Sequence, residues 1–396
     1  MIFEKKRPGA KPGARFAALF GAAFAAFGSA PLQADPMHGV DVYRADGHAP
    51  MGVMGDHMHK TGEMMLSFRQ MHMEMEGNRS GTLSISAEEI VTSVPNVHFG
   101  KPMQPPTLRV VPQDMSMDMY MAGFMYAPSD WLTLTAMGMY LEKEMEALTF
   151  QGMTGTARLG TFTTRSSGLG DTKVAGLLRL DHSETRQVHL NLGLSLPTGS
   201  ITEEDDVLTP MNTRPVMRLP YGMQLGSGTF DLEPGITYTD RQGDFSWGGQ
   251  ARATLRLGTN DEGYAFGDIG RLTGWAAYQW APWISTSLRA QGEVEGSIDG
   301  QDAWIAGPTQ AADPANYGGK RIMLSAGVNL IGQSDTLDGA LAGHRLGIEF
   351  GLPAYQDLNG PQMERDWTLT IGWQKCSANH IINCHKRPKI LRFLWR

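Results

Sequence analysis

Apolar and polar residues alternate with a period of two through most of the chain, from Gly62 to Trp373. In the clearest stretch, leucine and valine residues alternate with His189, Asn191 and Ser195. This pattern is typical of β-strands with one apolar and one polar face. The segments are about 10–16 residues long, whereas soluble strands average ~5–6 and tilted membrane strands need ~9–11. The alternation predicts strands at residues 62–76, 114–128, 131–146, 168–181, 187–199, 228–240, 244–258, 268–281, 283–297, 320–332, 343–355 and 365–374.

The connectors between these segments alternate between short and long. The long ones are residues 77–113, 147–167, 200–227 and 298–319, and only 333–342 and 356–364 depart from the alternation. Short periplasmic turns and long outer loops are typical of outer-membrane barrels. Lipid offers no hydrogen-bond partner, so a sheet in a bilayer must close on itself. The sequence therefore predicts an all-β fold, an antiparallel transmembrane β-barrel of about 12 strands. The alternatives, a soluble β-sandwich or a β-helix, fit less well because sandwich strands are shorter.

Both ends of the chain differ from this body. Residues 1–34 combine a basic start with an apolar run at 16–30, which predicts a cleaved signal peptide, since a membrane anchor needs a longer run. A His/Met-rich N-terminal segment at 35–61 precedes the outer-membrane β-barrel, predicted at 62–374. A basic, irregular tail follows at 375–396.

The tail holds both cysteines of the chain. A frameshift or a translational read-through would explain its composition. Alternatively, it is a periplasmic extension in which Cys376, His380, Cys384 and His385 bind a metal.

The charge balance restricts the partners. The chain has a formal net charge of −7, yet five basic residues lie in 1–34 and six in 375–396, so the body is more acidic. Such a body excludes nucleic acid as a partner. We expect outer-membrane lipid, lipopolysaccharide, the barrel assembly machinery and a small-molecule or metal solute instead. The acidic run at 203–206 is either solvated or binds divalent cations that bridge lipopolysaccharide.

Methionine is concentrated in the first part of the body, where 19 of the 25 methionines lie between Met37 and Met153. They alternate along the first three predicted strands on the face expected to line the lumen. They either pack beneath a plug or along an apolar solute path, or they bind a soft metal, since thioethers prefer Cu(I) and imidazoles accept Cu(II). Copper is the one cofactor considered, and the channel requires none. The candidate ligands are His57, His59, Met54, Met58, Met71, Met73, Met115, Met117, Met119, Met121, Met137 and Met139.

The sequence predicts no enzyme. A hydrolase needs a nucleophile beside a base. His189 and Ser195 share a strand face but are six residues apart, which is roughly 20 Å along a strand. We therefore expect no catalytic residues.

Four motifs resemble a known family. These are SGLGD at 167–171, GLSLPTG at 193–199, LPYGMQLGSG at 219–228, and the methionine-rich opening GVMGDHMH at 52–59. They resemble outer-membrane transporter proteins of the phenol-degradation meta-pathway family, and the opening resembles a methionine-rich subgroup. The resemblance covers roughly residues 50–374 and implies a channel for small, often apolar compounds. We therefore expect an outer-membrane channel or transporter for small solutes with a methionine-lined lumen wall. The alternative is a copper-binding envelope protein that uses the His/Met segment and the Met-rich strands.

Overall fold

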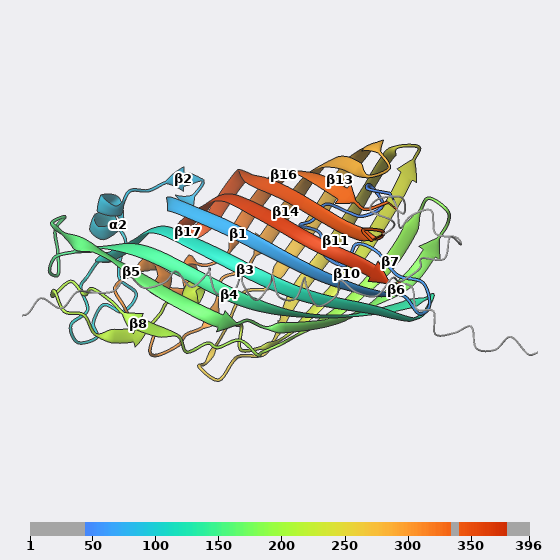
Figure 1. Ribbon diagram of the computed structural model, residues 1–396. Coiled ribbons are helices and arrows are strands. Elements are labelled where there is room, and N and C mark those ends of the chain that lie inside the picture. The colour runs from blue at the N-terminus through green and yellow to red at the C-terminus, as the bar shows by residue number, and fades with distance from the viewer. Residues whose placement is uncertain (1–43, 334–339, 378–396) are drawn as a thin grey trace, which may run out of the picture.

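The computed structural model describes residues 44–333 and 340–377. The predicted signal peptide, residues 35–43 and residues 378–396 of the tail lie outside these ranges. The described chain forms a closed antiparallel β-barrel with strongly tilted strands (Figure 1). The barrel closes because β17 (His344–Ser377) pairs with β1 (Met64–Gly81). The prediction of an all-β closed barrel is therefore confirmed.

Eleven named strands follow one another around the ring. Residues 345–358 of β17 pair with β16, and residues 358–377 pair with β1, so β17 is a hairpin with two legs. The chain turns at Gly360, whose φ of 70° is accessible to glycine without steric cost. Counting both legs, the ring agrees with the expected number of about 12. The other ring strands are β3 (Val110–Ser129), β4 (Leu132–Phe150), β6 (Thr172–His182), β7 (Gln187–Leu196), β10 (Phe230–Gln242), β11 (Phe245–Leu257), β13 (Ile269–Ala281), β14 (Ile284–Glu295) and β16 (Gly319–Ile331).

A further strand, β5 (Arg158–Leu169), pairs only with residues 140–150 of β4, at the long-loop end of the barrel. β6 pairs with residues 132–137 of β4, at the short-turn end, and Gly170 and Asp171 connect β5 to β6. The expected loop at 147–167 is therefore wrong, because β4 continues to Phe150 and β5 starts at Arg158. The connector at 356–364 is likewise no loop but the tip of the β17 hairpin.

The long connections carry small elements at one end of the barrel, on the left in Figure 1. Helix α2 (Ala87–Ser93) starts at Ser86, which forms a capping box with Glu89. No helix in the described part of the chain is long and apolar enough to span a bilayer. The remaining small elements are β2 (Leu83–Ser84), β8 (Glu204–Asp206), β9 (Val216–Arg218), η1 (Tyr221–Met223), β12 (Tyr264–Ala265), β15 (Asp299–Gly300), η2 (Gln310–Ala312) and η3 (Pro314–Asn316).

The strands expose apolar side chains outward and bury polar ones inward. On β14, Leu288 is 69% exposed, whereas Ser285 and Ser287 are buried. Because a soluble protein of this size buries its leucines, this inverted arrangement identifies a lipid-facing surface. Trp131, Trp280 and other aromatic residues are exposed at the short-turn end, where an interfacial girdle is expected.

The outer halves of β1, β3 and β4 depart from the expected apolar outer face. These strands have 18, 20 and 19 residues, whereas crossing a bilayer needs ~9–11. Residues 114–126 of β3 pair with β1 and with β4 without a register shift. A face that points outward at one end of this stretch therefore points outward at the other end. Beyond Tyr120 and Tyr140 these positions are largely acidic, which indicates that the strands continue beyond the bilayer. The acidic positions are Glu74, Glu76, Asp114, Asp118, Glu142, Glu144 and Glu146.

Candidate functional site

Residues 44–63, the N-terminal plug, lie inside the barrel at its short-turn end. The plug enters beside two turns, since Ala45 N donates to Pro282 O at 3.2 Å and Arg44 Nη2 donates to Gly243 O at 2.8 Å. It leaves toward β1 beside another turn, where Thr61 N donates to Asp130 Oδ1 at 2.8 Å. The described part of the His/Met-rich segment therefore occupies the lumen.

Side chains from widely separated strands hold the plug in place. Its carbonyl groups accept hydrogen bonds from Arg69 of β1 (3.1 Å), His189 of β7 (2.9 Å) and Gln250 of β11 (3.0 Å). Gly52 N donates to Glu349 of β17 at 3.0 Å. The plug thus spans the lumen from wall to wall. His189, which was weighed above as a base, serves here to anchor backbone.

A cavity of about 460 Å³ lies next to the plug, on the side of the long loops. Residues 52–56 of the plug form part of the cavity lining. Adjacent strands β1, β3 and β4 supply most of its sulfur atoms, and we call their inward-facing methionines the methionine wall. The methionines that line the cavity are Met54, Met65, Met71, Met73, Met117, Met121, Met125, Met137 and Met323. One side of the cavity is therefore apolar and polarizable.

The rest of the cavity is charged. Its lining includes six basic and three acidic residues. Arg252 Nη2 donates to Glu233 at 3.1 Å and Arg271 Nε donates to Glu293 at 2.7 Å. These residues belong to β10, β11, β13 and β14, which lie across the ring from β1, β3 and β4. The cavity therefore has an apolar wall facing a charged wall with an excess of positive charge.

An outer loop covers the other side of this cavity. Leu219 and Met223 pack against Met115 and Met145 at the outer end of the methionine wall. Lys143 Nζ donates to the carbonyl oxygens of Gly222 at 2.8 Å and Gln224 at 2.6 Å. Because Lys143 is half-buried there, these bonds stabilise the loop inside the barrel mouth.

Three of the motifs that carried the family resemblance meet at one junction. Asp171 Oδ1 accepts from Gly199 N at 3.0 Å, and Asp171 Oδ2 accepts from Ser227 N at 2.8 Å. The backbones of Gly199 and Gly226 approach so closely that a Cβ on Gly226 would lie 2.5 Å from Gly199 O. These motifs therefore anchor the outer loop.

The predicted metal-ligating methionines do not converge on one point. Met71, Met73, Met117, Met121 and Met137 line the cavity. Met119 and Met139 lie opposite Met71 and Met121, respectively, on the same inner face. Met115 belongs to the cluster beneath the outer loop. Met54 lines the cavity, and Met58 packs against Met65 and Met125. The sulfur atoms thus follow the wall from the plug to the outer loop.

The two predicted histidines lie together in the plug, with their ring centroids 4.9 Å apart. His57 also contacts two residues that the sequence pattern did not indicate as ligands: its Nδ1 is 3.4 Å from His48 Nδ1 and 2.9 Å from Asp56 Oδ1. Burial, together with His57, holds the pKa of His48 well below its usual range. Although burial opposes ionisation, His57 and His48 keep the pKa of Asp56 well below its usual value.

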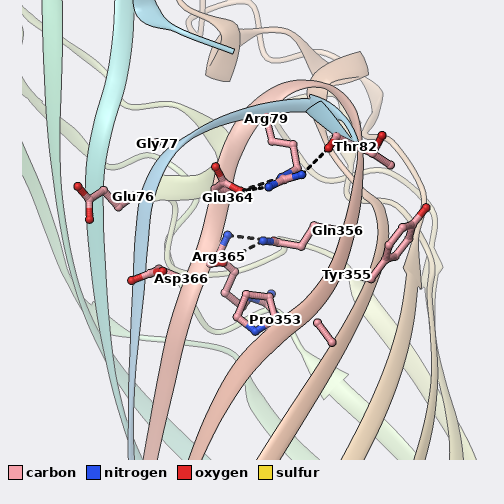
Figure 2. Close-up of a pocket in the computed structure, with 11 residues that line it drawn as sticks. Glu76, Gly77, Arg79, Thr82, Pro353, Tyr355, Gln356, Glu364, Arg365 and Asp366 are labelled. Carbon is pink, nitrogen blue, oxygen red and sulfur yellow. Dashed lines mark hydrogen bonds and ion pairs between the residues drawn. The ribbon is translucent and has the colours of Figure 1, made fainter. Parts of the chain in front are cut away.

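A second pocket, of about 600 Å³, lies at the outer end between β1 and β17 (Figure 2). Here the pairing of β1 with β17 shifts register. Arg79 Nε donates to Glu364 at 2.7 Å, and Gln356 Nε2 donates to Arg365 O at 2.9 Å. These groups satisfy one another, so the pocket follows from the strand irregularity. Arg365 lines both this pocket and the central cavity.

No family model and no curated protein matches this chain. Among solved structures, it is similar to the COG4313 outer membrane channel from Pseudomonas putida F1, with a TM-score of 0.52 and 11% identity over 82% of this chain and 98% of that one. A Pseudomonas aeruginosa FadL homologue has a TM-score of 0.40 and 8% identity over 79% and 90% of the respective chains. The likeness to the Pseudomonas putida channel is a likeness of fold. Together with the lipid-facing band, it identifies an outer-membrane β-barrel of the bacterial envelope.

Proposed function

We propose that the protein is an outer-membrane channel for small solutes with an apolar body, which pass along the methionine wall. The observation that carries this proposal is the cavity between the plug and the outer loop, lined by methionine on one side. Thioether side chains are apolar and flexible, so they accommodate varied apolar shapes. The proposal includes no catalytic step. Lipid and lipopolysaccharide surround the barrel, which the assembly machinery inserts.

The charged wall supports an amphipathic solute. Six basic and three acidic residues line the cavity. Several of them pair with one another, but a neutral hydrocarbon offers no partner to the surplus of positive charge. A small aromatic or aliphatic compound with an anionic group matches both walls at once, because its apolar body contacts methionine while its head approaches arginine. We therefore propose small apolar carboxylates as the preferred class.

Flux into proteoliposomes tests this proposal. Met73→Gln with Met117→Gln places amides in the route, and we expect roughly tenfold slower entry of benzoate, since apolar contacts are replaced by groups that must lose water. The matched variant, Met73→Leu with Met117→Leu, keeps the apolar surface and should keep the flux. Equal flux for both variants would exclude the methionine wall as the route.

Copper capture is a second candidate. The pairing of β1 with β3 sets Met71 opposite Met119 and Met73 opposite Met117, and the pairing of β3 with β4 sets Met121 opposite Met139. Neighbouring thioethers are suitable Cu(I) ligands, and His57 and His59 add imidazoles at the plug. In this proposal copper is the solute or cofactor.

A variant with four leucine substitutions separates the channel proposal from the copper proposal. Met115, Met117, Met119 and Met121 changed together to leucine should lose Cu(I) binding, because leucine offers no donor atom, while solute flux persists. Cu(I) titration against a competing chromophoric chelator measures the affinity. An unchanged affinity would eliminate the thioether site and leave the channel proposal intact.

A further inference from the structure

The N-terminal plug contains a compact group of metal-binding side chains. Ligand atoms of His48, Asp56 and His57 all lie within 4.8 Å of one another. The sequence does not place them together, since seven residues separate His48 from Asp56. The chain brings them together by turning back at residues 49–55, where Ala49 N donates to Asp56 Oδ2 at 2.9 Å.

The spacing of these atoms suits a small cation. Two donors bound to one tetrahedral metal at ~2.1 Å are themselves about 3.4 Å apart. His48 Nδ1 and His57 Nδ1 are 3.4 Å apart. Asp56 Oδ1 is 2.9 Å from His57 Nδ1, and Asp56 Oδ2 is 4.0 Å from His48 Nδ1, so the carboxylate lies beside both imidazoles.

The surroundings leave donor atoms without partners. Within the described ranges, Nε2 of His57 and Nε2 of His59 are buried and accept or donate no hydrogen bond. His59 is only 4% exposed, and its ring lies beside that of His57. An unpartnered buried polar atom is costly, so a bound ion that recruits one of these nitrogens stabilises the group. His59 is therefore a candidate for a further donor.

The donor chemistry indicates the class of ion. Two imidazoles and one carboxylate suit Zn²⁺ or Cu²⁺, whereas Ca²⁺ and Mg²⁺ require several oxygen ligands. Arg345 also lies close by, donating to Ala49 O. A cation next to this guanidinium must gain strong bonds to nitrogen, which again favours a transition metal.

We propose that His48, Asp56 and His57 bind a divalent transition-metal ion of the Zn²⁺ or Cu²⁺ type, and that this ion fixes the plug. The ion joins the two ends of the turn at residues 49–55. That turn includes Gly52, which donates to Glu349 on the far wall, and it contributes to the cavity floor. Binding the ion therefore stabilises the closed floor. Metal binding itself is independent of the proposed channel, whereas the effect on the floor rests on it.

Zinc titration of the folded protein tests the site. After EDTA treatment and dialysis, calorimetry should detect one equivalent of Zn²⁺, with no competition from Ca²⁺. Even indirect partners of metal ligands change affinity by ~10–100-fold, so His48→Gln and Asp56→Asn should each weaken binding at least ~10-fold. The asparagine keeps an acceptor for Ala49 N. His182→Gln, an exposed histidine at the same end of the barrel, should bind as the wild type does.

Conductance in planar bilayers tests the effect on the plug. Zn²⁺ should reduce open events of the wild type and leave His48→Gln unaffected. Wild-type zinc affinity in His48→Gln and Asp56→Asn, or no saturable binding at all, overturns the site. Zinc binding that leaves conductance unchanged overturns the role in fixing the plug. A protein that binds zinc but never conducts, with or without EDTA, supports the site and counts against the channel proposal.

Discussion

Single residues show where sequence reasoning succeeds and where it ends. His57 and His59 are two residues apart, and alternate residues of an extended chain lie on the same side, so the contact between their rings follows from the local sequence. The contacts of His48 with Asp56 and His57 were not predicted, because they depend on a turn, and a turn produces no periodic pattern in the sequence. Asp171 is similar: its motif was visible, but its partners Gly199 and Ser227 come from loops whose paths no local pattern fixes.

At the scale of elements, the period of two predicted the strands within the bilayer and some way beyond it, as far as residue 146 of β4. Within the bilayer, apolar outward residues alternate with inward residues, as on β7. Beyond Tyr140, outward positions of β4 are Glu142, Glu144 and Glu146 while inward positions include Met145. Polar and apolar residues still alternate, but here the polar residues point outward and the apolar ones inward. The outward side faces water, and the inward side packs under a loop. Residues 147–150 of β4 are all buried, so the alternation ends there, and these residues and β5 were missed.

The change of surroundings along β3 and β4 predicts how substitutions act. Leu134 is exposed in the apolar outer band, so Leu134→Lys should cost about 2–4 kcal/mol of unfolding free energy, as charges facing the bilayer core do. Asp114 is exposed on the acidic outer part of β3, so Asp114→Lys should cost at most about 1 kcal/mol. Urea unfolding in phospholipid vesicles measures both. Equal costs would mean that the acidic positions lie within the bilayer.

At the scale of the whole molecule, two parts of the chain distant in sequence enclose one cavity. The plug occupies the short-turn end, and residues 219–224 occupy the outer mouth, where Lys143 holds their carbonyl groups. The sequence predicted the cylinder, because closure follows from strands in lipid. It left open whether the N-terminal segment fills the lumen, because the segment's contacts come from β1, β7, β11 and β17, far apart in sequence.

Removing the plug should change conductance more than any single wall substitution. Deletion of residues 44–61 removes the floor of the cavity, so we expect larger and longer open events in planar bilayers. Gln250→Met, which removes one donor to the Met54 carbonyl, should give a smaller change in the same direction. Heat-modifiable mobility on gels must first show that both variants form barrels, since an unfolded deletion would conduct nothing. A folded deletion variant with wild-type conductance would place the barrier to flow at the outer loop, where Met223 and Leu219 pack on the methionine wall.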